Sequence, residues 1–550
     1  MMILRGFILS LLLLPAVQAA EVPRAAWDDY DQAGDLARLA GNESESMRFQ
    51  LLLSRLRERE ALWLPFADAL EAFGQARYER LRPLVLERSV SELQQAVAAG
   101  RMTYTELATF YLYRIRAIET DPERYLNALI ALDPTLLDQA RAADWQRARG
   151  RVVASDSLFG MPVLLKDNIG AAGMPTTAGA VALRDNLAGD AFITARLRES
   201  GALILGKANL SEWAYFFCED CPSGYSAQGG QTLNPYGRLQ FGTGGSSSGS
   251  GAGVAASLAA VAVGTETSGS ILSPASANSV VGLKPTTGAL SRSGIVPISA
   301  TLDTPGPLTR TVHDAVILFN AMAGFDTADT AMPLISDSLR LVYRQADITD
   351  WRLGALVQFL DNPLYEEALG LLSGAGSVIA EVMTPAVDTE GFGRLLGAEM
   401  VRDLALYLQQ HGAGNLPIDS IASLRRFNEQ DPALRAPYGQ ELVEMMDGLQ
   451  LSEAEVEALR QRLQDAARQA LDRLFVDNDL DVLLSINNRS AALAALANYP
   501  ALTVPMGYEE DGRPMGLTLI APSFAEQRLI DLGARFEALS QARRPPLSYQ

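Results

Sequence analysis

Short apolar runs that end in polar turns constrain the fold of this chain most strongly. The segments MPVLLKDN (161–168) and GALILGKAN (201–209) each carry an apolar run that ends at a lysine. Runs of this length, bounded by Gly and Pro, are typical of buried β-strands. Similar runs occur near the C-terminus in DVLLSIN, ALTVPMG and MGLTLIAP, and the turn EEDGRP predicts that the last two form a hairpin.

Helical patterns separate these predicted strands. Capping boxes formed by Ser89 with Glu92 and by Thr103 with Glu106 predict the starts of two helices. Residues 310–475 are predicted to be mainly amphipathic helix, as in SEAEVEALRQRLQDAARQALDRLF. Strands that alternate with helices indicate an α/β fold, and the C-terminal hairpin makes the sheet mixed.

Size and charge limit the classes of protein to which the chain can belong. Its 550 residues exceed the usual domain size of about 100–200 residues, so we expect one large α/β domain with additions or two to three domains. Hydrophobic residues make up 48%, which is enough for a large core. The formal net charge of −19 argues against nucleic acid as a partner, because an acidic surface repels phosphates.

The N-terminus has the form of a secretory signal peptide. In MMILRGFILSLLLLPAVQA (1–19), Arg5 provides a positive charge and Phe7 to Leu14 form a short apolar stretch. Val17 and Ala19 occupy positions −3 and −1 of the expected cleavage site. The apolar stretch is too short to span a bilayer as a stable helix. We therefore expect a periplasmic or secreted protein that has no membrane span in its mature form.

The two cysteines, Cys218 and Cys221, lie in the motif CEDC. Outside the cytosol they either form a local disulfide or stay as two free thiols, and the sequence favours neither state. Two sulfur ligands do not complete a zinc site, so no metal is expected there.

Residues 244–271, GGSSSGSGAGVAASLAAVAVGTETSGSI, combine serine and glycine with apolar residues. They lack the lysine of a P-loop and the last glycine of a dinucleotide-binding fingerprint. Apolar residues face every direction over 252–263, which predicts a buried helix. The pentapeptide GSSSG also matches GxSxG, a nucleophile elbow centred on Ser247. That esterase hypothesis needs a base, and the chain has only two histidines, His313 and His411.

Lysine usage points to a different base. Only three of the 46 basic residues are lysines, namely Lys166, Lys207 and Lys284. An arginine does not lose its proton in a protein, whereas burial lowers the pKa of a lysine. Lys166 follows the strand-like run PVLL and is therefore a candidate general base. The alternative is a buried ion pair between Lys166 and Asp167.

Three segments, GMPVLLKDN, GGSSSGSGAG and GTETSGSILSPAS, resemble the signature blocks of the amidase signature family. The flanking GKANLSEWA, GGQTLNP, VVGLKPTTG and DTPGPLTRTVHDA fit as well, and the chain is most similar to the bacterial peptide amidases of this family. The resemblance implies a central mixed β-sheet sandwiched between α-helices in an amidase domain over 89–545, and no cofactor. A helical extension over 20–88 precedes this domain, as a decoration of the core or a dimerisation element.

The resemblance also implies a Ser–Ser–Lys triad. Ser270 is the expected nucleophile, Ser246 the bridging serine and Lys166 the base, and the peptide bond before Ser246 is expected to be cis. The proton of Ser270 passes to Ser246 and from there to neutral Lys166, and Ser270 forms an acyl-enzyme that water hydrolyses. Backbone N–H groups of Thr267, Ser268, Gly269 and Ser270 are expected to form the oxyanion hole.

The expected substrate is a carboxamide, with peptide C-terminal amides favoured by the resemblance and aliphatic or aryl amides still open. Ser268 stands where family members usually carry Gly or Asp, and Leu272 stands where many carry Arg, so the two leave specificity open. Two further hypotheses are an esterase built on Ser247 and a non-enzymatic solute-binding protein. The family also includes an amidotransferase subunit that acts on charged tRNA, a role against which the signal peptide and the acidic charge argue.

Overall fold

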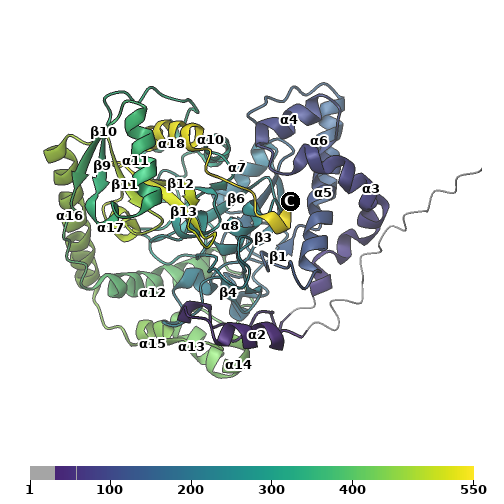
Figure 1. Ribbon diagram of the computed structural model, residues 1–550. Coiled ribbons are helices and arrows are strands. Elements are labelled where there is room, and N and C mark those ends of the chain that lie inside the picture. The colour runs from purple at the N-terminus through teal and green to yellow at the C-terminus, as the bar shows by residue number, and fades with distance from the viewer. Residues whose placement is uncertain (1–30, 57–58) are drawn as a thin grey trace, which may run out of the picture.

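The computed structural model describes residues 31–56 and 59–550, and the predicted signal peptide lies outside them. The chain forms an α/β fold around an eleven-stranded mixed sheet that helices flank on both sides, as the resemblance predicts (Figure 1). The strands follow the order β1-β3-β2-β6-β8-β7-β12-β13-β11-β9-β10. Their bounds are β1 Leu129–Leu132, β2 Pro162–Lys166, β3 Leu203–Ala208, β6 Val261–Glu266, β7 Val281–Lys284, β8 Thr304–Thr309, β9 Arg352–Leu356, β10 Val378–Val382, β11 Val482–Ile486, β12 Ala501–Tyr508 and β13 Pro514–Ile520.

All five predicted strands are present, and β12 and β13 form the predicted antiparallel hairpin. A separate small hairpin consists of β4 (Tyr225–Ser226) and β5 (Gly230–Gln231). At the centre of the sheet, β6 pairs in parallel with β2 and antiparallel with β8. The sheet is therefore mixed at its centre as well as in the C-terminal hairpin.

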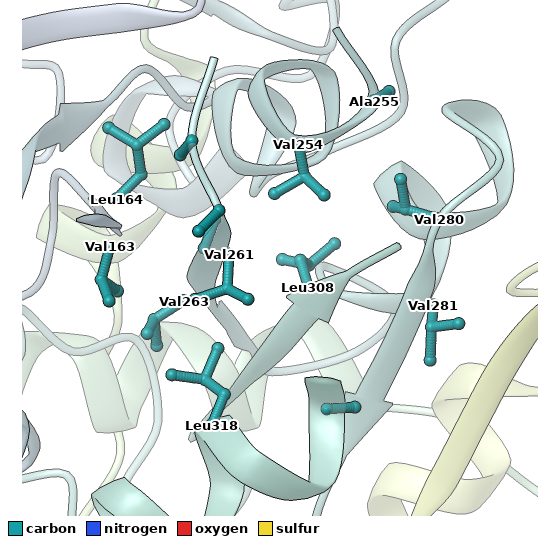
Figure 2. Packing of buried hydrophobic residues seen from close by; sticks show 14 of the residues in the cluster. Val163, Leu164, Val254, Ala255, Val261, Val263, Val280, Val281, Leu308 and Leu318 are labelled. Carbon is teal, nitrogen blue, oxygen red and sulfur yellow. The ribbon is translucent and has the colours of Figure 1, made fainter. Parts of the chain in front are cut away.

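The buried helix predicted over 252–263 is wrong in its second half. Helix α8 spans only Ser248–Ala255, the chain turns at Ser257 with a φ of 52°, and β6 follows. Both elements are buried on all sides, so the periodicity of apolar residues does not distinguish helix from strand here. Figure 2 shows Val254 of α8 and Leu308 of β8 directed toward each other in this core.

The prediction of mainly helix over 310–475 missed two strands, β9 and β10, which pair in parallel at one edge of the sheet. Each strand has five residues. β10 is mostly solvent-accessible because it forms the sheet edge, and the buried run LGAL of β9 is too short for periodicity to distinguish a strand from a helix. The rest of the segment is largely helical. Its helices are α10 Val312–Met322, α11 Pro363–Gly374, α12 Phe392–His411, α13 Ile421–Glu429, α14 Pro432–Arg435, α15 Glu441–Gly448 and α16 Glu453–Asn478.

Helices elsewhere follow the sequence signals closely. Both N-terminal capping boxes are formed, at Ser89 with Glu92 and at Thr103 with Glu106. No helix in the part of the chain that the structure describes is long and apolar enough to span a membrane. The remaining helices are α2 Ala33–Ala40, α3 Ala67–Val85, α4 Val90–Ala98, α5 Tyr104–Glu119, α6 Leu136–Ala148, α7 Phe192–Ser200, α9 Leu272–Ala277, α17 Ala491–Leu496 and α18 Glu526–Ser540.

The N-terminal extension is helical in α2 and α3, and residues 48–56 between them are irregular. This segment joins two distant parts of the chain. The N–H of Gln50 donates to Tyr438 Oη (2.9 Å), next to α14 and α15, and the Ser54 hydroxyl donates to the carbonyl of Ala227 (2.7 Å) between β4 and β5. Figure 1 accordingly places α2 beside α13, α14 and α15. Within the described residues, the extension packs against the main hydrophobic core.

Candidate active site

The structure brings Lys166 and Ser246 into direct contact. Lys166 is the last residue of β2, and its Nζ donates to Ser246 Oγ (2.7 Å), to Thr265 Oγ1 (2.8 Å) and to the Thr265 carbonyl (3.1 Å). Lys166 and Ser246 are both fully buried. Two hydroxyls and one carbonyl, from Ser246 and Thr265, therefore hold the side chain of Lys166 in one orientation.

No carboxylate pairs directly with Lys166 among the described residues. Its neighbour Asp167 instead forms a fully buried ion pair with Lys207, with Nζ and Oδ1 3.1 Å apart. Burial lowers the pKa of Lys166 from 10.5 to about 7, although the charges of Asp303 and Glu266 act in the opposite direction. A substantial fraction of Lys166 is therefore neutral near pH 7 and able to accept a proton. The ion-pair alternative for Lys166 is wrong.

All three lysines of the chain are buried. Lys207 is neutralised by Asp167, and burial lowers the pKa of Lys284 to about 8. The ammonium of Lys284 donates only to the carbonyl of Pro285 (3.2 Å) within the described chain. Lys166 alone of the three donates to a serine hydroxyl.

Ser246 and Ser270 lie on adjoining loops. The peptide bond between Gly245 and Ser246 is cis, as the resemblance implies, and the N–H of Ser247 donates to the carbonyl of Ser270 (3.1 Å). Ser270 is partly exposed, in contrast to Ser246. In residues 31–56 and 59–550 the Ser270 hydroxyl has no hydrogen-bond partner. Catalytic hydrogen bonds are often open in a free enzyme and form when substrate binds.

The predicted oxyanion hole is a tight turn between β6 and α9. Gly269 has a φ of +95°, and a Cβ at this position would lie 3.1 Å from Asn488 Nδ2, so glycine is the residue that fits. Glu266 Oε2 accepts hydrogen bonds from the N–H groups of Ile271 (2.7 Å) and Leu272 (3.0 Å), which fixes the end of the turn. Within the described residues, the N–H groups of 267–270 donate to no protein acceptor and are free for a ligand.

Asp303 connects this turn to the neighbouring wall. Its Oδ1 accepts from Thr267 Oγ1 (2.5 Å), and its Oδ2 accepts from the N–H groups of Ile298 (2.8 Å) and Ser299 (2.9 Å). Burial raises the pKa of Asp303 to about 6, although these hydrogen bonds favour the carboxylate. Asp303 is therefore largely ionised at pH 7 and loses its charge in mildly acidic solution.

A cavity of about 210 Å³ opens beside Thr265 and Thr267. Its wall includes Ala214, Val296, Ile298, Asp303, Tyr407 and His411. Polar and apolar residues line this space in similar numbers. It adjoins the candidate site through Thr265, which accepts from Lys166, and through Thr267 of the predicted oxyanion hole.

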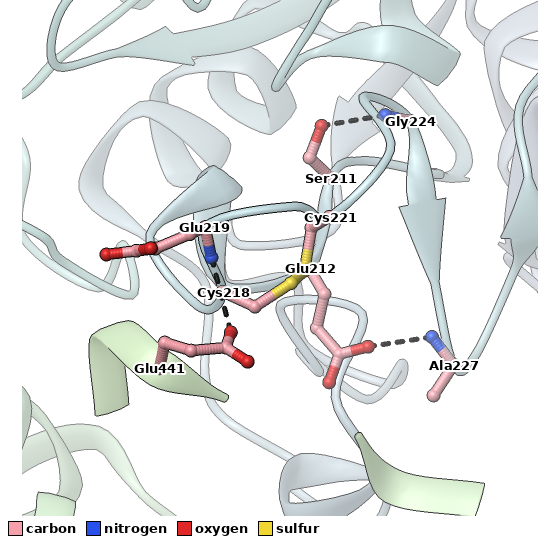
Figure 3. The surroundings of a disulfide bond; sticks show 8 residues. All are labelled: Ser211, Glu212, Cys218, Glu219, Cys221, Gly224, Ala227 and Glu441. Atoms are coloured by element: carbon pink, nitrogen blue, oxygen red, sulfur yellow. Dashed lines mark hydrogen bonds between the residues drawn. A yellow bond between two sulfur atoms is a disulfide. The ribbon is translucent and has the colours of Figure 1, made fainter. Parts of the chain in front are cut away.

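The segment that carries Ala214 has an unusual backbone. Trp213, Ala214 and Tyr215 have φ values of 51°, 54° and 77°, which non-glycine residues rarely adopt. The disulfide Cys218–Cys221 closes the turn that follows (Figure 3), so the question left open by the sequence is answered in favour of the disulfide. Ala214 lines the cavity, so the disulfide restrains the chain directly after one residue of the cavity wall.

The elbow hypothesis centred on Ser247 finds no support in the geometry. Ser247 is fully buried, and its Oγ donates to the carbonyl of Thr265 (3.0 Å) and accepts from the N–H of Thr265 (3.2 Å). His313 stacks on Tyr343 with ring centroids 4.5 Å apart, and His411 lies at the end of α12. Neither histidine forms a hydrogen bond to a serine of residues 244–271 in the described structure.

The family model described as Amidase matches residues 106–492. The chain belongs to the amidase signature family. It is an enzyme that hydrolyses amide bonds, and the family resemblance of its three signature segments is confirmed.

The relatives include enzymes from plants and bacteria. A probable amidase from Arabidopsis thaliana is 36% identical over 481 residues, which are 84% of this chain and 92% of the relative. An amidase family protein from Bacillus anthracis has a TM-score of 0.85 at 36% identity and covers 90% of this chain and 99% of its own. The native peptide amidase from Stenotrophomonas maltophilia has a TM-score of 0.77 at 39% identity, and the match covers 84% of this chain and 98% of the peptide amidase.

Two residues of this amidase site were not predicted from the sequence. Thr265 holds Lys166 by two hydrogen bonds, and Asp303 holds Thr267. Thr265 lies inside the block GTETSGSILSPAS and Asp303 begins the segment DTPGPLTR, both of which carry the family resemblance. No local pattern in either segment assigns these roles. The structure describes no group of three or more His, Cys, Asp or Glu side chains placed to hold a metal ion in residues 31–56 and 59–550.

Asp303 provides a test of the base in this amidase. Its negative charge raises the pKa of Lys166, so Asp303→Asn is expected to lower that pKa further. A base must be neutral to accept a proton, and the acidic limb of the pH profile of kcat/KM is therefore expected to move to lower pH. The measurement is kcat/KM for an amide between pH 5 and pH 9. Asp388→Asn at the surface is the control, and an unmoved limb in Asp303→Asn would contradict this role.

Proposed function

We propose that this amidase is exported and hydrolyses the C-terminal amides of peptides through Ser270, Ser246 and Lys166. The observation that carries the mechanism is the 2.7 Å contact between Lys166 Nζ and Ser246 Oγ in a buried site where the pKa of Lys166 is about 7. The preference for peptide amides is supported by the 39% identity to a peptide amidase. Export is inferred from the sequence of residues 1–19 alone.

The proposed reaction begins with proton transfer. Neutral Lys166 takes the proton of Ser246 while Ser246 takes the proton of Ser270, and Ser270 Oγ attacks the carbonyl carbon of the amide. This step requires the Ser246 and Ser270 hydroxyls to meet when substrate is bound. The N–H groups of 267–270 stabilise the negative charge on the carbonyl oxygen, and each such donor typically contributes about 100–1,000-fold to the rate.

The second half of the proposed reaction releases two products. The proton held by Lys166 returns through Ser246 to the leaving nitrogen, so that ammonia departs and an ester links the acyl group to Ser270. Water then loses a proton to the same relay and attacks the ester carbon. The carboxylic acid leaves, and Ser270 recovers its proton.

The experiment that tests this function is ammonia release from three sets of compounds: peptide amides, aryl amides and aliphatic carboxamides. We expect the highest kcat/KM with peptide amides. A clear preference for aryl or aliphatic amides would contradict the proposed substrate but not the triad. Release of ammonia with no transfer to tRNA would also separate this enzyme from the amidotransferase subunits of the family.

A further inference from the structure

A crevice of about 960 Å³ lies next to the cavity of the active site. We call it the outer crevice. Residues of α12 such as Val401 and Arg402 form one side, and residues of α16 such as Glu453 and Arg460 form another. Nothing in the proposed reaction uses this space.

The outer crevice adjoins the active-site cavity directly. Arg292, Ala300 and Thr330 line both spaces. Arg292 is fixed there, because its Nε and its backbone N–H both donate to Asp329 Oδ2 (2.9 and 2.8 Å) and its guanidinium also donates to the carbonyl of Ala300. A ligand that extends from the cavity past Arg292 therefore enters the outer crevice, and the hydrogen bonds of Arg292 keep this boundary in place.

The sizes of the two spaces differ in a way that fits an extended substrate. Sites that enclose a whole drug-sized ligand usually measure about 300–1,000 Å³. The cavity beside Thr267, at about 210 Å³, is smaller than this range, whereas the outer crevice lies near its upper end. The cavity is therefore suited to the group next to the cleaved bond, and the remainder of a longer molecule needs the adjoining space.

The lining of the outer crevice is suited to peptide rather than to a highly charged ligand. Its lining carries three arginines and three glutamates, so their charges balance, and Arg402 pairs with Asp403 and Arg460 with Glu457. Between them lie apolar side chains and uncharged amides, among them Leu449, Val456, Gln464 and Asn498. Such a surface offers hydrogen bonds to a main chain and apolar contacts to side chains without selecting one sign of charge.

We propose that the outer crevice binds the residues that precede the amidated residue of an oligopeptide amide. This inference rests on the proposed peptide amidase function and names the substrate class as oligopeptides rather than single amino-acid amides. Contacts remote from the reacting bond raise kcat/KM when they are kept in the transition state.

The experiment measures kcat/KM for N-terminally blocked peptide amides of one to six residues that share the same C-terminal residue. We expect an increase of about tenfold or more from the shortest to the longest substrate. Val401→Trp fills the outer crevice from α12, where this side chain is 37% exposed, and is expected to abolish the gain with length while the shortest amide is unaffected. Val476→Trp, the same change at an exposed site of α16 outside the crevice, is the matched control.

Each outcome separates the inference from the function on which it rests. A flat length dependence in the unmodified enzyme overturns the outer crevice as a subsite but leaves a peptide amidase. Hydrolysis of no peptide amide of any length overturns both. If Val401→Trp loses activity on the shortest amide too, the test is repeated with Glu453→Trp, at an exposed position on the opposite side of the outer crevice. An equal loss of activity on short and long substrates in Glu453→Trp also overturns the proposal.

Discussion

Ser270→Ala is expected to lower kcat/KM for amide hydrolysis by about 10⁴-fold or more, because removal of a nucleophile eliminates the acyl-enzyme route. The same substitution is expected to change the free energy of unfolding by less than about 0.5 kcal/mol, since Ser270 is partly exposed and its hydroxyl has no partner in the described structure. The measurements are ammonia release, labelling by a fluorophosphonate probe and denaturant unfolding.

Ser247→Ala is the matched control for this loss. Ser247 is buried and its hydroxyl bonds twice to the backbone of Thr265, so alanine is expected to reduce stability by about 1–3 kcal/mol while activity per folded molecule persists. The reverse pattern, with activity lost in Ser247→Ala and retained in Ser270→Ala, would contradict the assignment of Ser270 as the nucleophile.

Lys166→Met is the second substitution with a large expected effect. Methionine keeps much of the volume of lysine but accepts no proton, and we expect kcat to fall by at least about 10²–10⁴-fold, the usual contribution of a general base. Lys166→Arg is expected to be inactive as well, because a guanidinium stays protonated. Recovery of activity in Lys166→Arg would show that a positive charge, and not a base, is needed at this position.

Stability measurements on Lys166→Met give an independent test. In the folded enzyme the pKa of Lys166 is about 7, well below the ordinary 10.5. Between these values the unfolded chain binds a proton that the folded enzyme lacks, so the contribution of Lys166 to the free energy of unfolding increases as pH rises through this window.

Methionine does not titrate, and the difference between the two proteins isolates this effect. We expect the wild type to gain a few kcal/mol relative to Lys166→Met between pH 7 and pH 10, since one pKa unit corresponds to about 1.4 kcal/mol. A lysine held charged by an ion pair would give no gain between pH 7 and pH 10 and a loss of stability only above its ordinary pKa of 10.5. That result would exclude Lys166 as a base that is neutral at physiological pH.

Much of the fold was predictable because several elements carry local signals. The strand around Val163 has five residues, and the capping boxes that start the two helices lie within the short segments Ser89–Glu92 and Thr103–Glu106. The transition from α8 to β6 was not predictable, since both elements are fully buried and lack a polar face. Strands β9 and β10 were missed because they are short, and β10 is also mostly exposed.

The candidate site also contains residues that the sequence predicted and residues that it did not. Lys166 was singled out from composition alone, and Ser246 and Ser270 from the resemblance of their segments. Asp303 acts on Thr267 across 36 residues of chain, and no local pattern encodes such a contact. The pairing of Asp167 with Lys207, and not with its neighbour Lys166, likewise depends on the register between β2 and β3.

The burial of Lys166, Lys207 and Lys284 has a consequence for the chemistry of the whole surface. These are the only lysines of the chain, and each has at most 1% of its surface exposed. Amine-specific acylating reagents should therefore leave all three lysines of the folded enzyme unmodified. Acylation of a lysine would mark molecules whose interior has opened.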